Sequence, residues 1–319
     1  MLSRVADSLY WMSRYLERAE HMARLVEVNL GLTLEQAQPL CDDRWPRVLS
    51  ALGVDKVRAA EMDAHTILRS ITFDPANGSS IISAIISARE NARQVREQIS
   101  SEMWEELNRL FHELRRAAIG SSEAEPQTFL EVVMQGSQLF QGITDSTMTH
   151  GEGWQFIQMG RYIERASATA QLMDIHFQRY LPFPEVQIEP EDHLEWIGLL
   201  KSCTAFEAYC KVYTADLRAE RIAEFLLLSE EFPHSVRFAV EQIQNALNAV
   251  GATATRRGTG KLTRLSGRLR AALSFSQMDE ILASGLDTYL ENVKKQCTQI
   301  HGAVHQVYID YPIEPSKTF

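Results

Sequence analysis

The chain has 319 residues, of which 45% are hydrophobic and 23% are charged, and it carries a formal net charge of −10. These values are typical of a globular protein with a sizeable core, and the acidic balance excludes a general nucleic-acid-binding surface, which needs a broad basic face. With no basic-then-apolar N-terminal segment and no run of 18 apolar residues, we expect a cytoplasmic protein that does not cross a membrane.

The first part of the chain has apolar residues at helical spacing, interrupted by segments rich in proline, glycine and aspartate. We expect a connector at 33–46, which contains two prolines, and a tight turn at 74–79. The short polar segment 121–127 is the best boundary between two halves of the chain. Helices are predicted over residues 3–30, 55–71, 80–99, 101–119 and 129–142.

The second part continues the helical pattern. A glycine-containing loop at 150–153 opens a helix that runs to about residue 180, and three prolines then end it. Helical spacing returns over 191–217, and a last helix begins near Ser276, where Ser276 and Asp279 resemble a capping box. No segment alternates apolar and polar residues over the length of a strand, so the chain is predicted to be all-α.

One stretch of the sequence occurs twice. Residues 11–27 match residues 158–174 at an offset of 147 positions, and a weaker match joins 73–81 to 228–236 at an offset of 155. We therefore predict an elongated bundle of about ten helices in two pseudo-duplicated halves, 1–120 and 151–319, joined by a helix and loop at 121–150. The identical pairs of the first match are Met12/Met159, Arg14/Arg161, Tyr15/Tyr162, Glu17/Glu164, Arg18/Arg165, Ala19/Ala166, Ala23/Ala170 and Leu25/Leu172.

The repeated segment has apolar residues on one face of the helix and charged residues on the opposite face. In the first copy the charged face also contains Tyr10 and Leu25, which a solvated face would not need. We therefore expect a helix that is contacted on both sides, with a cluster of arginine and glutamate that is at least partly buried. The charged residues of this face are Arg14, Glu17, Arg18 and His21.

These motifs resemble those of the bacterial α-E family, whose members are helical and share a Glu-Arg motif. The resemblance extends over nearly the whole chain, in the order that the family shows. Its motifs here are Tyr-Trp-x-x-Arg-Tyr-Leu-Glu-Arg-Ala-Glu at 10–20, Ala-Arg-Glu-Asn-Ala-Arg at 88–93 running into 101–108, Gly-Trp at 153–154 with Gly-Arg-Tyr-Ile-Glu-Arg-Ala at 160–166, and 224–228 with 232–238.

The Glu-Arg cluster allows two interpretations. In the first interpretation, the cluster is a structural ion network: arginines of one copy pair with glutamates of the other and specify how the helices pack. Alternatively it is a site, in which arginines hold a carboxylate or phosphate while Glu17 or Glu164 acts as an acid or base. The candidate binding residues are Arg14, Arg18, His21, Arg161 and Arg165.

Two further patterns in the sequence concern metal and phosphate binding. A di-iron bundle site needs Glu-x-x-His repeats, but Glu17 and His21 are one position too far apart, so we expect no metal site. The segment 256–270 contains six basic residues and no acidic one. It lacks the first glycine, the Ser/Thr and the preceding strand of a phosphate loop. It is therefore either a solvated loop or a contact, through Arg257 and Lys261, for a partner's acidic surface or a phosphorylated ligand.

The resemblance also implies partners. Family members are typically encoded beside a circularly permuted ATP-grasp protein, a transglutaminase-like peptidase and sometimes a proteasome-like hydrolase. We therefore expect a helical partner subunit in a system that makes or cleaves peptide or amide bonds, with ATP and Mg²⁺ bound by the ATP-grasp protein and no cofactor of its own. The alternatives are an independent enzyme acting on a peptide-like or carboxylate substrate at the cluster, and a purely structural adaptor. Self-association into a homo-oligomer is left open.

Overall fold

The computed structural model describes residues 1–35, 44–54, 63–119, 126–179, 188, 192–214, 216–253 and 258–309. Within these ranges it contains fourteen α-helices and no β-strand, which confirms the all-α prediction. None of the described helices is long and apolar enough to span a lipid bilayer.

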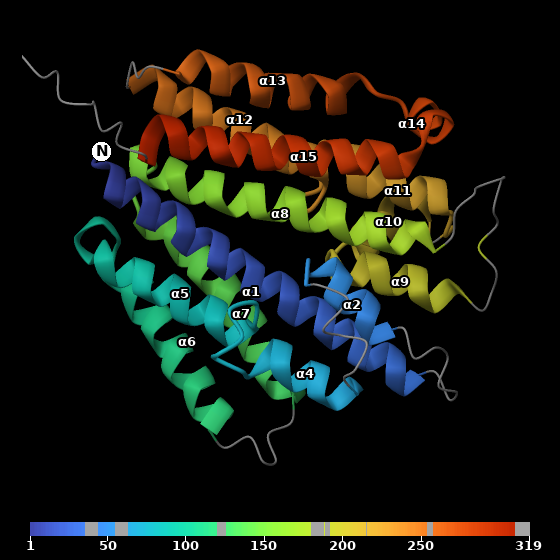
Figure 1. Ribbon diagram of the computed structural model, residues 1–319, viewed down its shortest axis with the longest axis horizontal. Coiled ribbons are helices and arrows are strands. Elements are labelled where there is room, and N and C mark those ends of the chain that lie inside the picture. The colour runs from blue at the N-terminus through green and yellow to red at the C-terminus, as the bar shows by residue number, and fades with distance from the viewer. Residues whose placement is uncertain are drawn as a thin grey trace, which may run out of the picture.

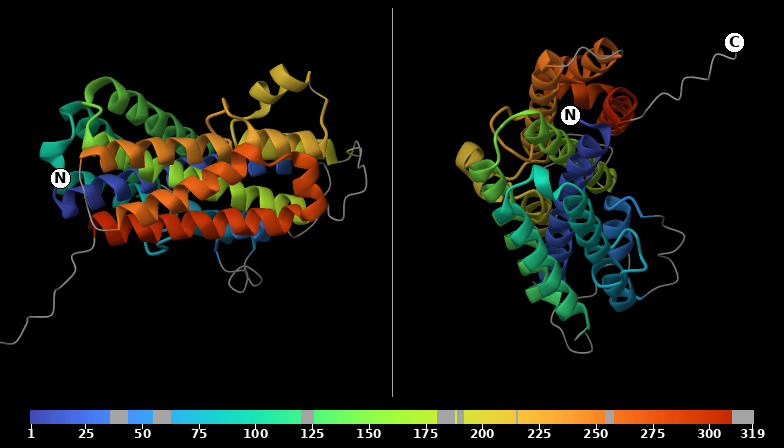
Figure 2. Two further views of the ribbon diagram at one scale, coloured as in Figure 1. Left: turned by 90° about the horizontal axis from the view of Figure 1, so that it is seen from above. Right: turned by 90° about the vertical axis from the view of Figure 1, so that its left-hand side faces the viewer.

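The helices of the first part of the chain lie together in the lower part of Figure 1, and those of the second part lie above them. The end-on view in Figure 2 shows the same division, and α1 of the first group packs against α8 of the second where the two groups meet. The first group comprises α1 (Ser3–Glu35), α2 (Arg44–Ala51), α4 (Ala64–Thr72), α5 (Ile81–Gln94), α6 (Ser101–Ile119) and α7 (Pro126–Thr147). The second comprises α8 (Glu152–Gln178), α9 (His193–Ser202), α10 (Phe206–Tyr213), α11 (Ala219–Leu228), α12 (Val236–Thr253), α13 (Thr259–Phe275), α14 (Met278–Ser284) and α15 (Leu286–Val304).

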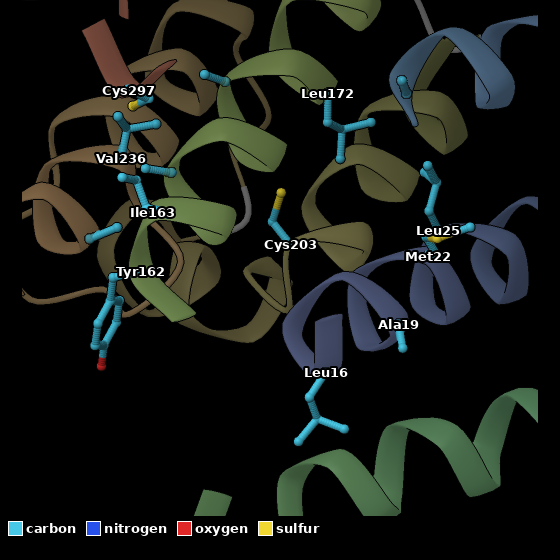
Figure 3. Close-up of a cluster of buried hydrophobic side chains, with 14 of the residues drawn as sticks. Leu16, Ala19, Met22, Leu25, Tyr162, Ile163, Leu172, Cys203, Val236 and Cys297 are labelled. Atoms are coloured by element: carbon cyan, nitrogen blue, oxygen red, sulfur yellow. The ribbon is translucent and has the colours of Figure 1, made fainter. Parts of the chain in front are cut away.

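The repeated segments form α1 and α8, the two longest described helices, and these pack against each other. Helix α1 also packs against α5, α7 and α9, while α8 packs against α12, α15 and α2. Both faces of α1 are consequently covered, as the sequence predicts: Tyr10 is 0% exposed and Leu25 is 3% exposed, although they share a face with the charged residues. Figure 3 shows part of the resulting core, with Leu16, Ala19, Met22 and Leu25 on α1 and with Ile163 and Leu172 on α8.

The α1–α8 crossing depends on small residues. Gly160 of α8 lies against the backbone of Tyr10, and a Cβ atom added to Gly160 would stand 2.2 Å from the Tyr10 carbonyl oxygen and 2.3 Å from the Ser13 hydroxyl oxygen. Ser13 keeps its own hydroxyl satisfied by donating to the Tyr10 carbonyl over 3.0 Å. The close approach of these two backbones brings the charged residues of the two helices within hydrogen-bonding distance of each other.

Two predicted elements were wrong: a helix begins within a predicted connector, and a predicted single helix is divided in two. The predicted connector 33–46 includes the start of α2, since Pro46 stands in the first helical turn, where its missing N–H has no intrahelical acceptor. The predicted helix 191–217 is divided into α9 and α10, because Thr204 adopts a left-handed conformation with φ of 51°.

The C-terminal part also differs from expectation. Ser276 and Asp279 form no capping box: α14 begins after Gln277 and has no side-chain cap. Gly285, with φ of 99°, then separates α14 from α15. Most of the basic run 256–270, for which a loop was one expectation, is part of helix α13. The prolines after residue 180 and residues 121–125 of the predicted boundary 121–127 lie outside the described residues, and residues 126 and 127 begin α7.

Candidate functional site

Glu17 of α1 is held by arginines of α8. The Glu17 carboxylate accepts hydrogen bonds from Arg165 Nε over 2.5 Å and from Arg165 Nη2 over 2.9 Å, and Arg161 Nε lies 3.7 Å from it. The Arg165 side chain is 3% exposed and that of Glu17 is 4% exposed. This is a buried, bidentate ion pair of the kind that an interior charge requires.

Glu164 of α8 is held in the reciprocal way by arginines of α1. Arg14 donates to Glu164 Oε2 from Nε over 2.8 Å and approaches it with Nη2 at 2.6 Å, while Arg18 Nε donates to Glu164 Oε1 over 2.5 Å. Each helix therefore supplies one glutamate and two arginines to its neighbour. The structure brings together Arg14, Glu17, Arg18, Arg161, Glu164 and Arg165, and we call these six residues the Glu-Arg cluster.

Further side chains, which the sequence did not single out, complete the hydrogen bonding of the cluster. His301 of α15 meets Arg14 Nη1 at 3.1 Å and the Tyr10 hydroxyl at 2.7 Å through its Nδ1 atom. On the other side, Gln141 of α7 accepts a hydrogen bond from Arg161 Nη2 over 2.6 Å. Both partners come from helices distant in sequence and carry no motif, so no signal in the sequence identified them.

Burial and charge shift the carboxyl groups in opposite directions. Burial would raise the pKa of Glu164, but the charges of Arg14 and Arg18 outweigh it and hold that pKa below its usual range. Glu20, one turn beyond Glu17, has its pKa raised by burial and by the charge of Glu17. Glu164 is consequently a poor general base at neutral pH, because a carboxylate that two guanidinium groups stabilise resists protonation.

His21 lies beside the cluster and is kept neutral. Burial lowers the pKa of His21 to about 4, against the opposing charges of Glu17 and Glu164. Its Nε2 atom is shielded from solvent and has no hydrogen-bond partner among the described residues. Burial likewise lowers the pKa of His176 to about 3. Both imidazoles therefore remain neutral in the folded protein near pH 6.

We expect stability to fall steeply in mild acid. A histidine whose folded pKa is depressed contributes stability that is present above its unfolded pKa of 6.5 and is lost as the pH falls toward the folded value of about 4. For His21 this is about 3 kcal/mol of unfolding free energy. Urea denaturation at pH 7 and pH 4.5 should show a smaller loss for His21→Gln than for the wild type. Equal losses in the two proteins would contradict the assignment of a neutral, buried His21.

A cavity of about 450 Å³ opens beside one side of the cluster. Arg14, Arg18, His21 and Glu164 line it, together with Lys294 of α15. On the side of Arg161 the described residues line a pocket of only about 20 Å³. The two sides of the cluster thus differ in their access to solvent.

The remaining predicted residues are not part of this site. Lys261 is exposed in the first turn of α13 and does not line the cavity, and Arg257 lies outside the described residues. No group of three or more His, Cys, Asp and Glu side chains in the described ranges is arranged to hold a metal ion.

Comparison with known proteins agrees with this arrangement. A family described as "Alpha-E: A predicted alpha-helical domain with a conserved ER motif" matches residues 1–309. Relatives include an uncharacterised protein of Mycobacterium bovis and uncharacterised proteins of two Mycobacterium tuberculosis strains; each is 23% identical over 333 residues, which cover 95% of this chain and 36% of the relative. No solved structure matches the chain significantly. The match includes both Glu-Arg repeats, which pair across α1 and α8, and it spans nearly every residue. The chain therefore belongs to the alpha-E family.

Proposed function

We propose that this protein is a helical partner subunit of a cytoplasmic, ATP-grasp-linked system that forms or processes peptide or amide bonds, and that it has no complete active site of its own. The observation that carries the proposal is the pairing of the cluster. Both motif glutamates are buried and each is held by two arginines, so neither is available as an acid or base.

The length of the relatives supports a role as a module. The chain spans 36% of each of the mycobacterial relatives, so in those proteins the corresponding region is joined to a longer remainder. A helical domain that occurs within a larger chain is suited to act on a neighbouring domain. In this protein, we propose that the neighbour is a separate ATP-grasp protein, which would bind ATP and Mg²⁺.

We also propose that the fold arose by duplication of one helical half. Two loops 155 positions apart support this, because their hydrogen bonds correspond. The Ser80 hydroxyl donates to the carbonyl of Asp74 over 2.6 Å and accepts from the backbone N–H of Ser83 over 3.2 Å. The Ser235 hydroxyl donates to the carbonyl of Ser229 over 2.5 Å and accepts from the backbone N–H of Phe238 over 3.0 Å.

The second candidate function is an independent enzyme, and the 450 Å³ cavity favours it, because a pocket beside charged groups is the usual form of an active site. Its weakness is chemical. Glu164, the one carboxylate among the described residues that line this cavity, has its pKa held below the usual range, whereas a general base that works at neutral pH needs a pKa near 7.

The test is ATP turnover by the ATP-grasp protein, measured alone and with this protein added. We expect the wild type to co-elute with the ATP-grasp protein and to stimulate turnover at least several-fold. Arg18→Gln should stimulate less, because Arg18 faces the cavity, whereas Arg93→Gln should match the wild type, because Arg93 is a surface residue of α5 whose side chain is 61% exposed.

Absence of both co-elution and stimulation would contradict the partner proposal. Hydrolysis of peptide substrates by this protein alone would instead favour the independent enzyme. The variant is chosen at Arg18 rather than at Glu17 or Glu164, because removing a buried glutamate would disturb folding and obscure the result.

A further inference from the structure

The cavity beside the Glu-Arg cluster has one cation with hydrogen-bond donors to spare. Arg18 donates from Nε to Glu164, but its two Nη groups donate to no other group in the described part of the chain. Its side chain is 35% exposed and lines the cavity. Arg14, by contrast, uses Nε, Nη1 and Nη2 on Glu164 and His301.

The other charged groups near the cavity are already paired. Lys294 contacts Asp174 at 2.6 Å and Glu291 at 2.8 Å, and it donates to Gln171 over 3.1 Å. Glu164 is neutralised by its two arginines. The cation with unused hydrogen-bond donors in the described cavity wall is therefore Arg18, whose Nη groups can hold a single anionic group.

The equivalent arginine in the other copy has all of its donor groups occupied by the protein. Arg165, 147 positions after Arg18, donates from Nε and Nη2 to Glu17 and from Nη1 to the carbonyl of Pro233 over 3.2 Å, and the charge of the buried Glu20 also acts on it. Glu20 itself is hydrogen-bonded by Arg24 over 3.2 Å and by Gln141 over 3.3 Å. In this copy a second carboxylate of the protein accompanies the arginine in the interior.

Around Arg18 the described residues supply no such second carboxylate, because smaller side chains replace the pair Glu20 and Arg24. The residues 147 positions after Glu20 and Arg24 are Ser167 and Gln171, and both line the cavity. Shortening a glutamate to a serine removes a carboxylate and leaves space beside the arginine. Arg18 of the first copy thus faces an open place lined by Ser167, whereas Arg165 of the second copy has Glu20 nearby.

The rest of the cavity wall includes apolar groups. Met22, Leu52 and Ala168 are among the residues that line it, and Gly53 contributes wall without a side chain. A volume of about 450 Å³ is larger than a single inorganic anion needs and falls within the range of small-ligand pockets. The occupant should therefore combine an anionic end with an aliphatic body.

We propose that this cavity binds the free carboxylate of a short peptide or similar aliphatic acid, with the carboxylate on the Nη groups of Arg18, in the space that Ser167 lines. The proposal deepens the proposed function, since a subunit of an amide-bond system would present such an acid to its partner. Only this later use of the bound acid rests on the proposed function. Binding itself depends on this chain alone.

The experiment is calorimetric or NMR titration of the isolated protein with acetyl-Leu-Ala carrying a free C-terminus. We expect saturable binding with a dissociation constant of about 1 mM or lower. The C-terminal amide of the same peptide, which lacks the charge, should bind at least about tenfold more weakly, and so should the acid to Arg18→Gln. Inorganic phosphate should also bind more weakly than the peptide, because it leaves the apolar wall uncovered.

A second variant gives Arg18 a nearby carboxylate, as Arg165 has in the other copy. Ser167→Glu places a protein carboxylate beside Arg18 and should abolish peptide binding while the variant stays folded, as judged by thermal unfolding. Arg93→Gln should bind as the wild type does. No saturation with the peptide, equal binding by wild type and Arg18→Gln, or phosphate binding as tightly as the peptide would each overturn the proposal. Peptide binding without stimulation of ATP turnover would overturn the partner function alone, and stimulation without peptide binding would overturn this site alone.

Discussion

Replacing Gly160 with alanine is expected to lower the free energy of unfolding by about 3 kcal/mol or more, at or above the upper end of the usual cost of overpacking a core. The added methyl group would stand 2.2 Å from the carbonyl oxygen of Tyr10, which is backbone and cannot rotate away. Relief requires α1 and α8 to separate, and separation lengthens the ion pairs of the cluster. Guanidinium denaturation followed by circular dichroism measures the effect.

Gly142→Ala is the matched control. Gly142 lies within helix α7, and a Cβ atom there would meet nothing within 4 Å. Alanine loses less backbone entropy on folding and favours the helix, so this variant should gain about 0.5–1 kcal/mol. A cost below about 1 kcal/mol for Gly160→Ala would show that the helices do not approach as closely as described.

Glu17→Gln is expected to cost about 3–5 kcal/mol of unfolding free energy, and Glu164→Gln distinctly less. Removing the Glu17 carboxylate leaves the charge of Arg165 unpaired, and this guanidinium is 3% exposed. Removing the Glu164 carboxylate leaves Arg14, which is 12% exposed, and Arg18, which is 35% exposed; both line the cavity, so water can hydrate their charges. The same charge deletion therefore has unequal consequences in the two copies.

Urea denaturation of the two variants under identical conditions measures this difference. A larger loss of unfolding free energy for Glu164→Gln than for Glu17→Gln would contradict the difference in solvent access between the Arg18 side and the Arg165 side of the cluster. The comparison also separates the two interpretations of the motif, because a purely catalytic glutamate can be replaced by glutamine without a large loss of stability.

The element pattern was accessible from the sequence where helices are long and regular. The helix predicted over 101–119 has those bounds in the structure, and the repeated segments form the expected long helices α1 and α8. Local conformation was less accessible: Thr204, a residue type that rarely adopts a left-handed conformation, gives no warning that it ends α9. The basic run before residue 270 was not assigned to a helix, although its Leu262 and Leu269 are buried at helical spacing.

The candidate site divides in a similar way. Pairing between arginines of one copy and glutamates of the other followed from the repeat itself, because the same residues recur at the same helical positions. The roles of His301, Gln141 and Lys294 did not follow, since they come from α15 and α7 and reach the cluster only through packing. The unequal exposure of Arg18 and Arg165 was equally inaccessible, because the repeated motif is identical at these two positions.

The sequence by itself determined the helical class, the repeated motif and the family, because each depends on residue spacing along one chain. The tertiary structure alone decided which face of the cluster is open. Helix period places Arg18 and Arg165 on equivalent faces, but their exposure depends on side chains from several helices, with Glu20 and Gln141 enclosing one side while Ser167 leaves the other accessible. Which side chains meet at a contact between distant segments is decided only when the molecule is packed. For this reason two equivalent positions of a repeated motif differ in their exposure.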